Sequence, residues 1–399
     1  MSEYQNIVVI GASQAGHSLV NALAPNLPTT HRILLVDALD FAFWPIASLR
    51  AAVVPGWEKR VTAPLNTSTV FDAGSAHQVI APNKVVELRE SSIVLEKPFE
   101  GSTELPFFRC VIATGASQPA PMRPAEGATE ESYRAELVKS QEEIAKATKV
   151  VVIGSGAVGV EMAGEIKSAH PSKSITIVSA SPHVLNPGPV EPAKDKDSWV
   201  SPTVLPKLSS ALEAAIPALG IDLILNERVV VPSSGAAVAE GEKDRRGGLC
   251  VCVDWKQAEL GNRAEGGPRS GEGGLVVVDE FLRVRSDKLK NYYAVGDVSN
   301  TPGWKTVQGA KYDGEGAAPN IVADVKGQSG KKYVRPTAHG MIIPLGPKEV
   351  RGHLTLPVVG TWMLPNAMGK AVKGTKLFVE DSWLPRFKGA EKVAVPAPA

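Results

Sequence analysis

The sequence predicts an α/β protein with two Rossmann-like dinucleotide-binding units and a small C-terminal segment. Three stretches of the chain carry this prediction. Two of them run from a short apolar strand through closely spaced glycines into residues with helical spacing. The third is an apolar strand, late in the chain, that ends in Gly296-Asp297.

The central stretch begins with a β-branched strand at residues 150–153 and breaks into Gly154-Ser-Gly156-Ala-Val-Gly159. Gly154 permits a tight turn, Gly156 lets the backbone approach a pyrophosphate, and Gly159 lets the next helix pack closely on the strand. The helix N-terminus adds N–H groups and a positive dipole. Because the glycines stand between a strand and a helix, as this mechanism requires, the stretch predicts a dinucleotide site.

The N-terminal stretch repeats the pattern. An apolar strand at residues 6–10 precedes Gly11 and Gly16, and an apolar helix follows. Ser13 replaces the middle glycine, and its small side chain still allows fairly close approach. The residues of this turn that we expect to bind a cofactor are Gly11, Ser13, Ala15 and Gly16.

The residue that ends the second strand differs between the two units. Asp37 follows the strand at 32–36, about twenty residues past the glycines, where the adenosine ribose hydroxyls are bound. Ser179 takes the corresponding place in the central unit. The missing carboxylate removes the repulsion that would exclude a 2′-phosphate, but no arginine adjoins Ser179, so NADH and NADPH both stay open. Two dinucleotides in one chain indicate a flavin enzyme supplied by a nicotinamide.

Two short motifs are expected to complete the flavin site. A strand at 107–113 ends in Thr114-Gly115, a tight turn of the kind found near a ligand. The later strand ends at Gly296, which allows close backbone approach, and Asp297, which can accept hydrogen bonds from ribityl hydroxyls. A helix expected from about residue 304 would direct its positive end at the flavin pyrimidine.

Composition limits the alternatives. A chain of 399 residues is long enough for two or three domains. The formal net charge of +1 does not favour nucleic acid as a partner. There is no apolar run near the eighteen or so residues of a membrane-spanning helix, and the first residues lack the basic flank and apolar core of a signal peptide. These features predict a cytoplasmic protein, at most peripheral on a membrane surface.

The three cysteines argue against a redox-active disulfide and a cysteine-bound metal. None forms a Cys-x-x-Cys pair beside the first unit, which argues against a redox-active disulfide. Cys110 lies in an apolar run and is expected in the core. Cys250 and Cys252 lack further cysteine or nearby histidine ligands, so no metal site is expected.

The predicted domains are a discontinuous flavin-binding domain (1–120 and 280–335), an NAD(P)H-binding domain (125–279) and a C-terminal segment (336–399). Within them we expect an antiparallel excursion at 61–100, a linker at 117–129 and helices at 130–148 and 205–216, the second stopped by Pro217 and Gly220. We also expect a solvated hairpin at 240–274 that contains a strand at 249–255, a strand pair around 341–343 and 358–359, and a disordered tail.

Lysines recur every three residues near the C-terminus, at Lys370, Lys373 and Lys376. Beside apolar residues, such a stripe is typical of a basic segment on anionic lipid. A solvated face on a packed terminal helix is the simpler interpretation of this spacing. A peripheral membrane contact or a homodimer through this segment is therefore left open.

With these motifs, the chain resembles the two-dinucleotide-fold flavoprotein superfamily, whose fold is glutathione-reductase-like. It is most similar to its apoptosis-inducing-factor-like and ferroptosis-suppressor branch, near the type II NADH dehydrogenases. The resemblance implies FAD on the first and last motifs, NAD(P)H on the central one and a quinone-like acceptor. The matching marks cover nearly the whole chain and are residues 11–16, Asp37, 113–115, 154–165 and 294–297.

The resemblance also implies two catalytic residues that face the flavin and nicotinamide. These are a glutamate in the central Gly-Val-Glu and a lysine shortly after the Gly-Asp, which fall here on Glu161 and Lys305. No proline directly precedes Lys305, which departs from the family pattern. Glu161 could instead be a solvated or capping carboxylate, and Lys305 a surface lysine.

The predicted activity is hydride transfer from nicotinamide C4 to flavin N5, followed by two-electron reduction of a quinone-like acceptor. Two alternatives stay open. One is a reductase that passes electrons to a small redox protein. The other is an FAD-bound redox sensor or interaction protein with little turnover.

Overall fold

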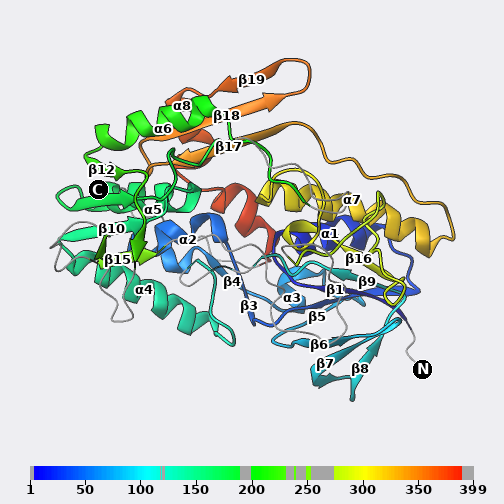
Figure 1. Ribbon diagram of the computed structural model, residues 1–399. Coiled ribbons are helices and arrows are strands. Elements are labelled where there is room, and N and C mark those ends of the chain that lie inside the picture. The colour runs from blue at the N-terminus through cyan, green and yellow to red at the C-terminus, as the bar shows by residue number, and fades with distance from the viewer. Residues whose placement is uncertain are drawn as a thin grey trace.

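A computed structural model describes residues 4–116, 118, 122–188, 199–230, 238–239, 249–252 and 274–388. Its described part contains two parallel sheets, one in each half of the molecule, and a small antiparallel sheet above the second (Figure 1). This confirms the predicted α/β class with two Rossmann-like sheets. None of the described helices combines the length and apolar character needed to cross a bilayer.

The first sheet has five parallel strands in the order β16-β9-β1-β2-β5. Helices α1 (Gln14–Leu23) and α7 (Val307–Val325) pack together on it (Figure 1). α7 begins three residues later than expected, since Thr306 caps it by accepting from the Gly309 N–H. The strands are β1 (Gln5–Ile10), β2 (His31–Val36), β5 (Gln78–Ile80), β9 (Arg109–Ile112) and β16 (Tyr292–Ala294). Thus β16, late in the chain, returns to the sheet that the N-terminus begins.

The prediction of one antiparallel excursion at 61–100 is partly wrong. β5 lies inside that range, yet it pairs in parallel with β2 and forms the edge of the first sheet. Its apolar side chains cover the core there, a placement that local alternation alone does not reveal. The antiparallel elements are β3 (Phe41–Phe43) with β4 (Thr62–Pro64), and β6 (Val85–Leu88) with β7 (Ser92–Phe99) and β8 (Ser102–Pro106). Short helices α2 (Pro45–Ala51) and α3 (Thr67–Val70) lie between them in sequence.

The second sheet has four parallel strands in the order β12-β11-β10-β15. The predicted hairpin at 240–274 is wrong where the structure describes it, because β15 pairs in parallel with β10. The remainder of that stretch lies outside the described residues. The strands are β10 (Lys149–Ile153), β11 (Ser174–Val178), β12 (Ile221–Ile224) and β15 (Leu249–Cys252), followed by the separate pair β13 (Val229–Val230) and β14 (Val238–Ala239).

Three helices belong to this half: α4 (Glu130–Lys146), α5 (Ala157–Ala169) and α6 (Pro206–Ala218). α6 continues through Pro217, the first of the two residues that were expected to stop it, and ends before the second, Gly220. The buried Ala215 and Ile216 hold its last turn in place. Gly220, with φ of +72°, then provides the left-handed residue that ends the helical region.

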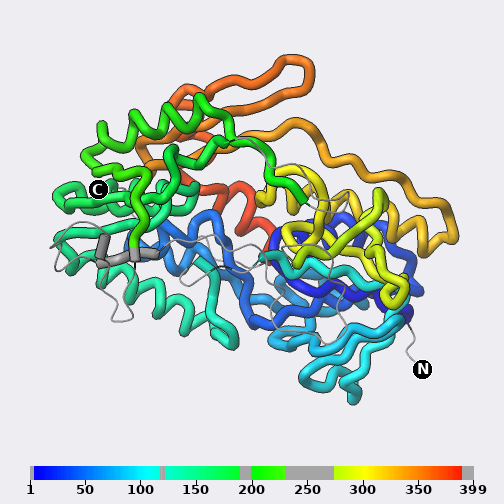
Figure 2. Tube along the Cα trace, in the orientation of Figure 1, coloured from blue at the N-terminus to red at the C-terminus, as the bar shows by residue number. Residues whose placement is uncertain are grey.

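The C-terminal segment forms an antiparallel sheet of β17 (His339–Pro344), β18 (Val350–Leu356) and β19 (Gly360–Met363), then α8 (Asn366–Gly369) and further short helical turns. Residues 357–359 are the turn between β18 and β19, so the strand predicted at 358–359 is wrong: Val358, with φ of +69°, has the left-handed backbone of a turn. Figure 2 shows this last part, in red, running back between the two halves. The predicted disordered tail, and residues 117 and 119–121 of the predicted linker, lie outside the described residues.

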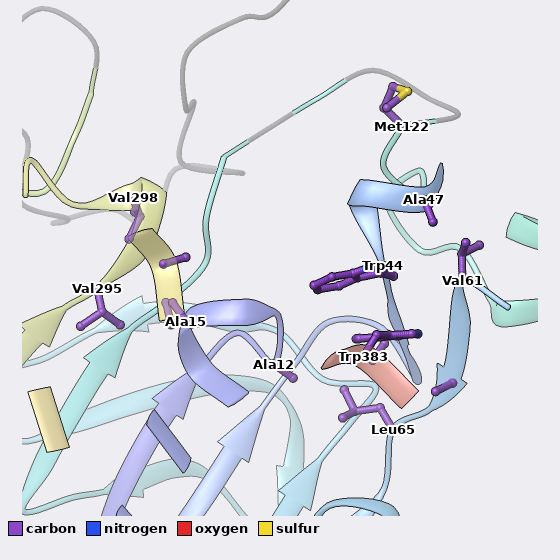
Figure 3. Packing of buried hydrophobic residues seen from close by; sticks show 14 of the residues in the cluster. Ala12, Ala15, Trp44, Ala47, Val61, Leu65, Met122, Val295, Val298 and Trp383 are labelled. Atoms are coloured by element: carbon purple, nitrogen blue, oxygen red, sulfur yellow. The ribbon is translucent and has the colours of Figure 1, made fainter. Parts of the chain in front are cut away.

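Aromatic rings fix the returning segment on the first unit. Trp383 stacks on Trp44 with ring centroids 5.3 Å apart, beside Ala12 and Leu65 (Figure 3). Phe387 packs edge-on against His17 of α1 at 4.9 Å. The last described residues therefore cover the helix that follows the first glycine turn.

His17 is expected to make the fold sensitive to acid. It is 1% exposed, and burial, with the nearby Arg386 charge, lowers its pKa from 6.5 to about 4. Between pH 6.5 and about 4 the unfolded chain binds a proton on this histidine and the folded chain does not. The free energy of unfolding therefore decreases as the pH is lowered through this range, by about 3 kcal/mol in total. We expect the free energy of unfolding, measured in urea, to decrease less between pH 7.5 and pH 5 in His17→Leu than in the wild type. An equal loss in both would contradict this.

Candidate active site

One cavity of about 960 Å³ lies where the two units and the C-terminal segment meet. Asp297, which was predicted to bind the flavin, lines it together with the predicted catalytic residues Lys305 and Glu161, the latter from α5. The structure thus brings both predicted catalytic residues to one cavity. The rest of its wall includes Gln14 and Trp44 from the first unit, Trp199, and Ile342, Lys373, Phe378 and Arg386 from the C-terminal segment.

Glu161 forms an ion pair with Lys373 in the wall of this cavity. The Lys373 Nζ donates to Glu161 Oε1 at 2.7 Å and to the Ile342 carbonyl at 2.9 Å. The two side chains are 12% and 15% exposed. Burial raises the pKa of the Glu161 carboxyl, and Lys373 acts in the opposite direction. Lys373 was not among the catalytic residues predicted from the sequence.

Lys373 also changes the interpretation of the C-terminal lysines. It turns inward to Glu161, whereas Lys376 is exposed and pairs with Glu380 at 3.1 Å. The segment consists of short helical turns rather than one helix. The lysines therefore do not form the single exposed stripe that the sequence suggested.

A second pair of charges, Asp297 and Lys305, lies on the same cavity. The Lys305 Nζ donates to the carbonyls of Ser299 and Thr301 and lies 5.6 Å from the centre of the Trp199 ring. Burial lowers the pKa of Lys305 to about 8, against the attraction of Asp297. Burial also raises the pKa of Asp297. The structure thus contradicts the simple alternative that Lys305 is a surface lysine.

The first glycine turn has the close packing expected of a pyrophosphate site. A Cβ on Gly16 would lie 1.9 Å from the Gly11 carbonyl oxygen. Ser13 is the N-cap of α1, but its side chain caps no N–H group. Because the N-cap side chain leaves the first N–H groups of α1 without a cap, they are suited to bind an anion. Ala15 is buried behind this turn, where a Cβ on Gly296 would lie 2.8 Å from its own Cβ.

Asp37 and Thr114 follow β2 and β9, the two strands that flank β1 in this sheet. The Asp37 carboxylate accepts from the backbone N–H groups of Ala12, at 2.7 Å, and Leu39, at 3.0 Å. Burial raises its pKa while these bonds lower it. The Thr114 hydroxyl oxygen is buried without a hydrogen-bond partner among the described residues, and Gly115 beside it faces open space. An orphaned hydroxyl next to open space fits a polar ligand such as FAD.

The central glycine turn fits a second dinucleotide. A Cβ on Gly159 would lie 2.1 Å from the Gly154 carbonyl oxygen, while one on Gly156 would meet no atom within 4 Å. Gly156 is the N-cap of α5, with no side-chain cap. Ser179, at the end of β11, accepts from the Ser155 hydroxyl at 2.8 Å. The turn is therefore tightly packed behind and open in front, as a bound pyrophosphate requires.

The chain matches one known protein family over most of its length. The family model described as pyridine nucleotide-disulphide oxidoreductase matches residues 5–314. The chain belongs to this family. It is accordingly a flavin- and NAD(P)H-dependent oxidoreductase.

Cys110 is buried, and burial raises the pKa of its thiol well above the usual range, as expected for a core cysteine.

Individual proteins of known name are similar to this chain in sequence or in fold. The chain is 26% identical over 397 residues to ferroptosis suppressor protein 1 of Xenopus laevis, covering 96% of each chain. It is 23% identical to apoptosis-inducing factor homolog B of Dictyostelium discoideum, covering 95% of this chain and 96% of the relative. The sulfide:quinone oxidoreductase of Aquifex aeolicus has a similar fold, with a TM-score of 0.67 at 17% identity over 92% of this chain and 88% of the other.

Proposed function

We propose that this oxidoreductase transfers reducing equivalents from NAD(P)H, through FAD, to a quinone-like acceptor. The observation that carries the proposal is the cavity that joins Glu161 and Lys373 to Asp297 and Lys305. It places charged groups of the central unit and of the flavin-site turn around one space. Met341, Ile342 and Ile343 give that space an apolar wall, which suits a quinone ring.

Bound FAD would supply the redox chemistry, by which NAD(P)H, one proton and a quinone become NAD(P)⁺ and a quinol. Within the proposal, the N-termini of α1 and α5 hold the two pyrophosphates. Asp37 and Asp297 accept hydrogen bonds from sugar and ribityl hydroxyls. Glu161, fixed by Lys373, orients the nicotinamide, and the Lys305 Nζ holds a proton and positive charge at the cavity wall.

The acceptor is tested by reducing the FAD-loaded protein with NAD(P)H under anaerobic conditions and then mixing it with a soluble quinone. Recovery of the oxidised-flavin absorbance within the turnover time would support a quinone acceptor. Recovery only with a small redox protein would replace the quinone by the first alternative. Reduction with negligible recovery from either would favour a redox sensor.

The protonation of Lys305 is expected to limit acceptor reduction at high pH. Since its pKa is about 8, the side chain is a cation below this value and neutral above it. The rate should therefore fall as pH rises through about 8. Lys305→Arg keeps a cation and should react at pH 9 as fast as at pH 7, measured by quinone-dependent flavin reoxidation. If the reoxidation rate of the arginine variant also fell as the pH rose through about 8, the Lys305 charge would have no role in this step.

The proposal places this reaction in the cytoplasm, with a peripheral membrane contact or a homodimer through the C-terminal segment. The exposed Val358 and Trp362 of the β18–β19 hairpin support a contact of this kind. Quinones partition into membranes, so a protein at a bilayer surface would meet its acceptor there. Flotation with phospholipid vesicles would detect the membrane contact, and sedimentation velocity would detect the dimer.

A further inference from the structure

Arg50 does not line the cavity, but it contacts the helix that carries Glu161 and the backbone next to Lys373. It is on α2 of the first unit and is 3% exposed. Its Nε and Nη2 donate to the two carboxylate oxygens of Glu165 at 2.9 and 2.8 Å. Glu165, also 3% exposed, stands one turn after Glu161 on α5.

The same guanidinium holds the chain immediately after Lys373. Its Nη1 donates to the Thr375 carbonyl at 2.7 Å and its Nη2 to the Gly374 carbonyl at 2.7 Å. It also lies 4.9 Å from the centre of the Trp57 ring. One side chain therefore uses four N–H donors, two toward the central helix and two toward the C-terminal segment.

These contacts close a ring of interactions. Starting at Glu161, the ring passes along α5 to Glu165, across Arg50 to Gly374, and back through the adjacent Lys373 to Glu161. Each half of the pair is thus held by the same group from a third element of the chain. We propose that Arg50 is a positioning residue that sets the separation and direction of the Glu161–Lys373 pair in the cavity.

Only arginine supplies what this position requires. A lysine would keep the charge, but its three donors on a single nitrogen cannot form a two-pronged bond to Glu165 and reach two carbonyls at once. Arg50→Lys therefore preserves the buried charge and loosens the geometry. A displacement of about 1 Å at a reacting centre can cost on the order of 10²-fold in rate.

The inference rests on the proposed function, because it assigns Arg50 a part in the reaction of the same cavity. Its test is a double-mutant cycle between Arg50→Lys and Lys373→Met, followed by anaerobic flavin reduction with NAD(P)H. Arg50→Lys alone should lower the limiting reduction rate about tenfold, with little change in the half-saturating nicotinamide concentration or the FAD content. In the Lys373→Met background, the same substitution should cost less than about twofold, because the pair it positions is gone.

Arg60→Lys is the matched control. Arg60 is 1% exposed, lies 4.5 Å from the same Trp57 ring and joins the first unit to Glu380 of the C-terminal segment at 2.8 Å. It contacts neither Glu165 nor the chain next to Lys373, so its loss should combine independently with Lys373→Met. If Arg50→Lys retains no FAD, Glu165→Gln, which breaks the same ring while preserving side-chain size, replaces it in the cycle.

Equal losses from Arg50→Lys in both backgrounds would overturn the inference and leave Arg50 a structural residue. So would a change confined to FAD content or nicotinamide affinity. If the wild-type protein were not reduced by NADH or NADPH at all, the proposed function would fail first. The cycle therefore separates an error about Arg50 from an error about the reaction.

Discussion

Replacing Lys373 with methionine is expected to slow flavin reduction by NAD(P)H by about 10²-fold, as for other buried charges aimed at a reacting centre. The substitution removes the cation 2.7 Å from Glu161 and also the bond to the Ile342 carbonyl. Burial already raises the pKa of Glu161, and without Lys373 it should rise further. Stopped-flow absorbance of the flavin, at saturating nicotinamide, measures this rate directly.

Two further variants separate the role of the pair from an effect of stranded charge. Lys376→Met removes an exposed lysine three residues away, which pairs with Glu380, and should leave the rate unchanged. Lys373→Met combined with Glu161→Gln removes the unpaired carboxylate. If that double variant regained the wild-type rate, the pair would have no part in the reaction and the single loss would come from the stranded charge alone.

The second large effect is expected at Gly159. Alanine there would place its Cβ 2.1 Å from the Gly154 carbonyl oxygen, so α5 must move away from β10. Overpacking of this kind costs about 1–3 kcal/mol, and the displacement also shifts Glu161 on the same helix. We expect a lower melting temperature, retained FAD and loss of reduction by NAD(P)H. Thermal unfolding and anaerobic nicotinamide titration measure the two effects.

Gly156→Ala is the matched control for this variant. Its Cβ would meet no atom within 4 Å, so the fold should be undisturbed. Any loss must then come from the space that the pyrophosphate needs, and the half-saturating NAD(P)H concentration should rise while the melting temperature stays constant. A melting temperature that fell as far as in Gly159→Ala would show that this turn is structural rather than ligand-binding.

The glycine turns were predictable because their signal is local. At Gly154–Gly159, strand, turn and helix follow one another within a few residues, and the close approach that excludes a Cβ is a property of that short stretch. The same holds for the N-terminal turn. Both motifs therefore determined the fold class from the sequence alone.

Lys373 could not be found in this way. It is 212 residues from Glu161 in the chain, and the two meet only because the C-terminal segment returns between the two halves. The lysine spacing suggested an exposed stripe, either on a solvated helix face or on a lipid surface, since periodicity does not report which side chain turns inward. Arg50 gave no signal at all, because its partners come from two other parts of the fold.

Parallel pairing was also beyond local patterns. β5 and β15 both lie in stretches whose turn residues and composition suggest antiparallel hairpins. Each instead joins a parallel sheet through a crossover, beside β2 and β10 respectively. Such pairing is decided by the core that the whole unit builds, not by the residues next to the strand.

The most direct test of the central claim is anaerobic mixing of the purified, FAD-loaded protein with NADH and, separately, NADPH. We expect rapid bleaching of the oxidised-flavin band, and the faster donor will show which nicotinamide the Ser179 site prefers. A protein that neither carries nor takes up FAD, or whose bound FAD neither nicotinamide reduces, would contradict it.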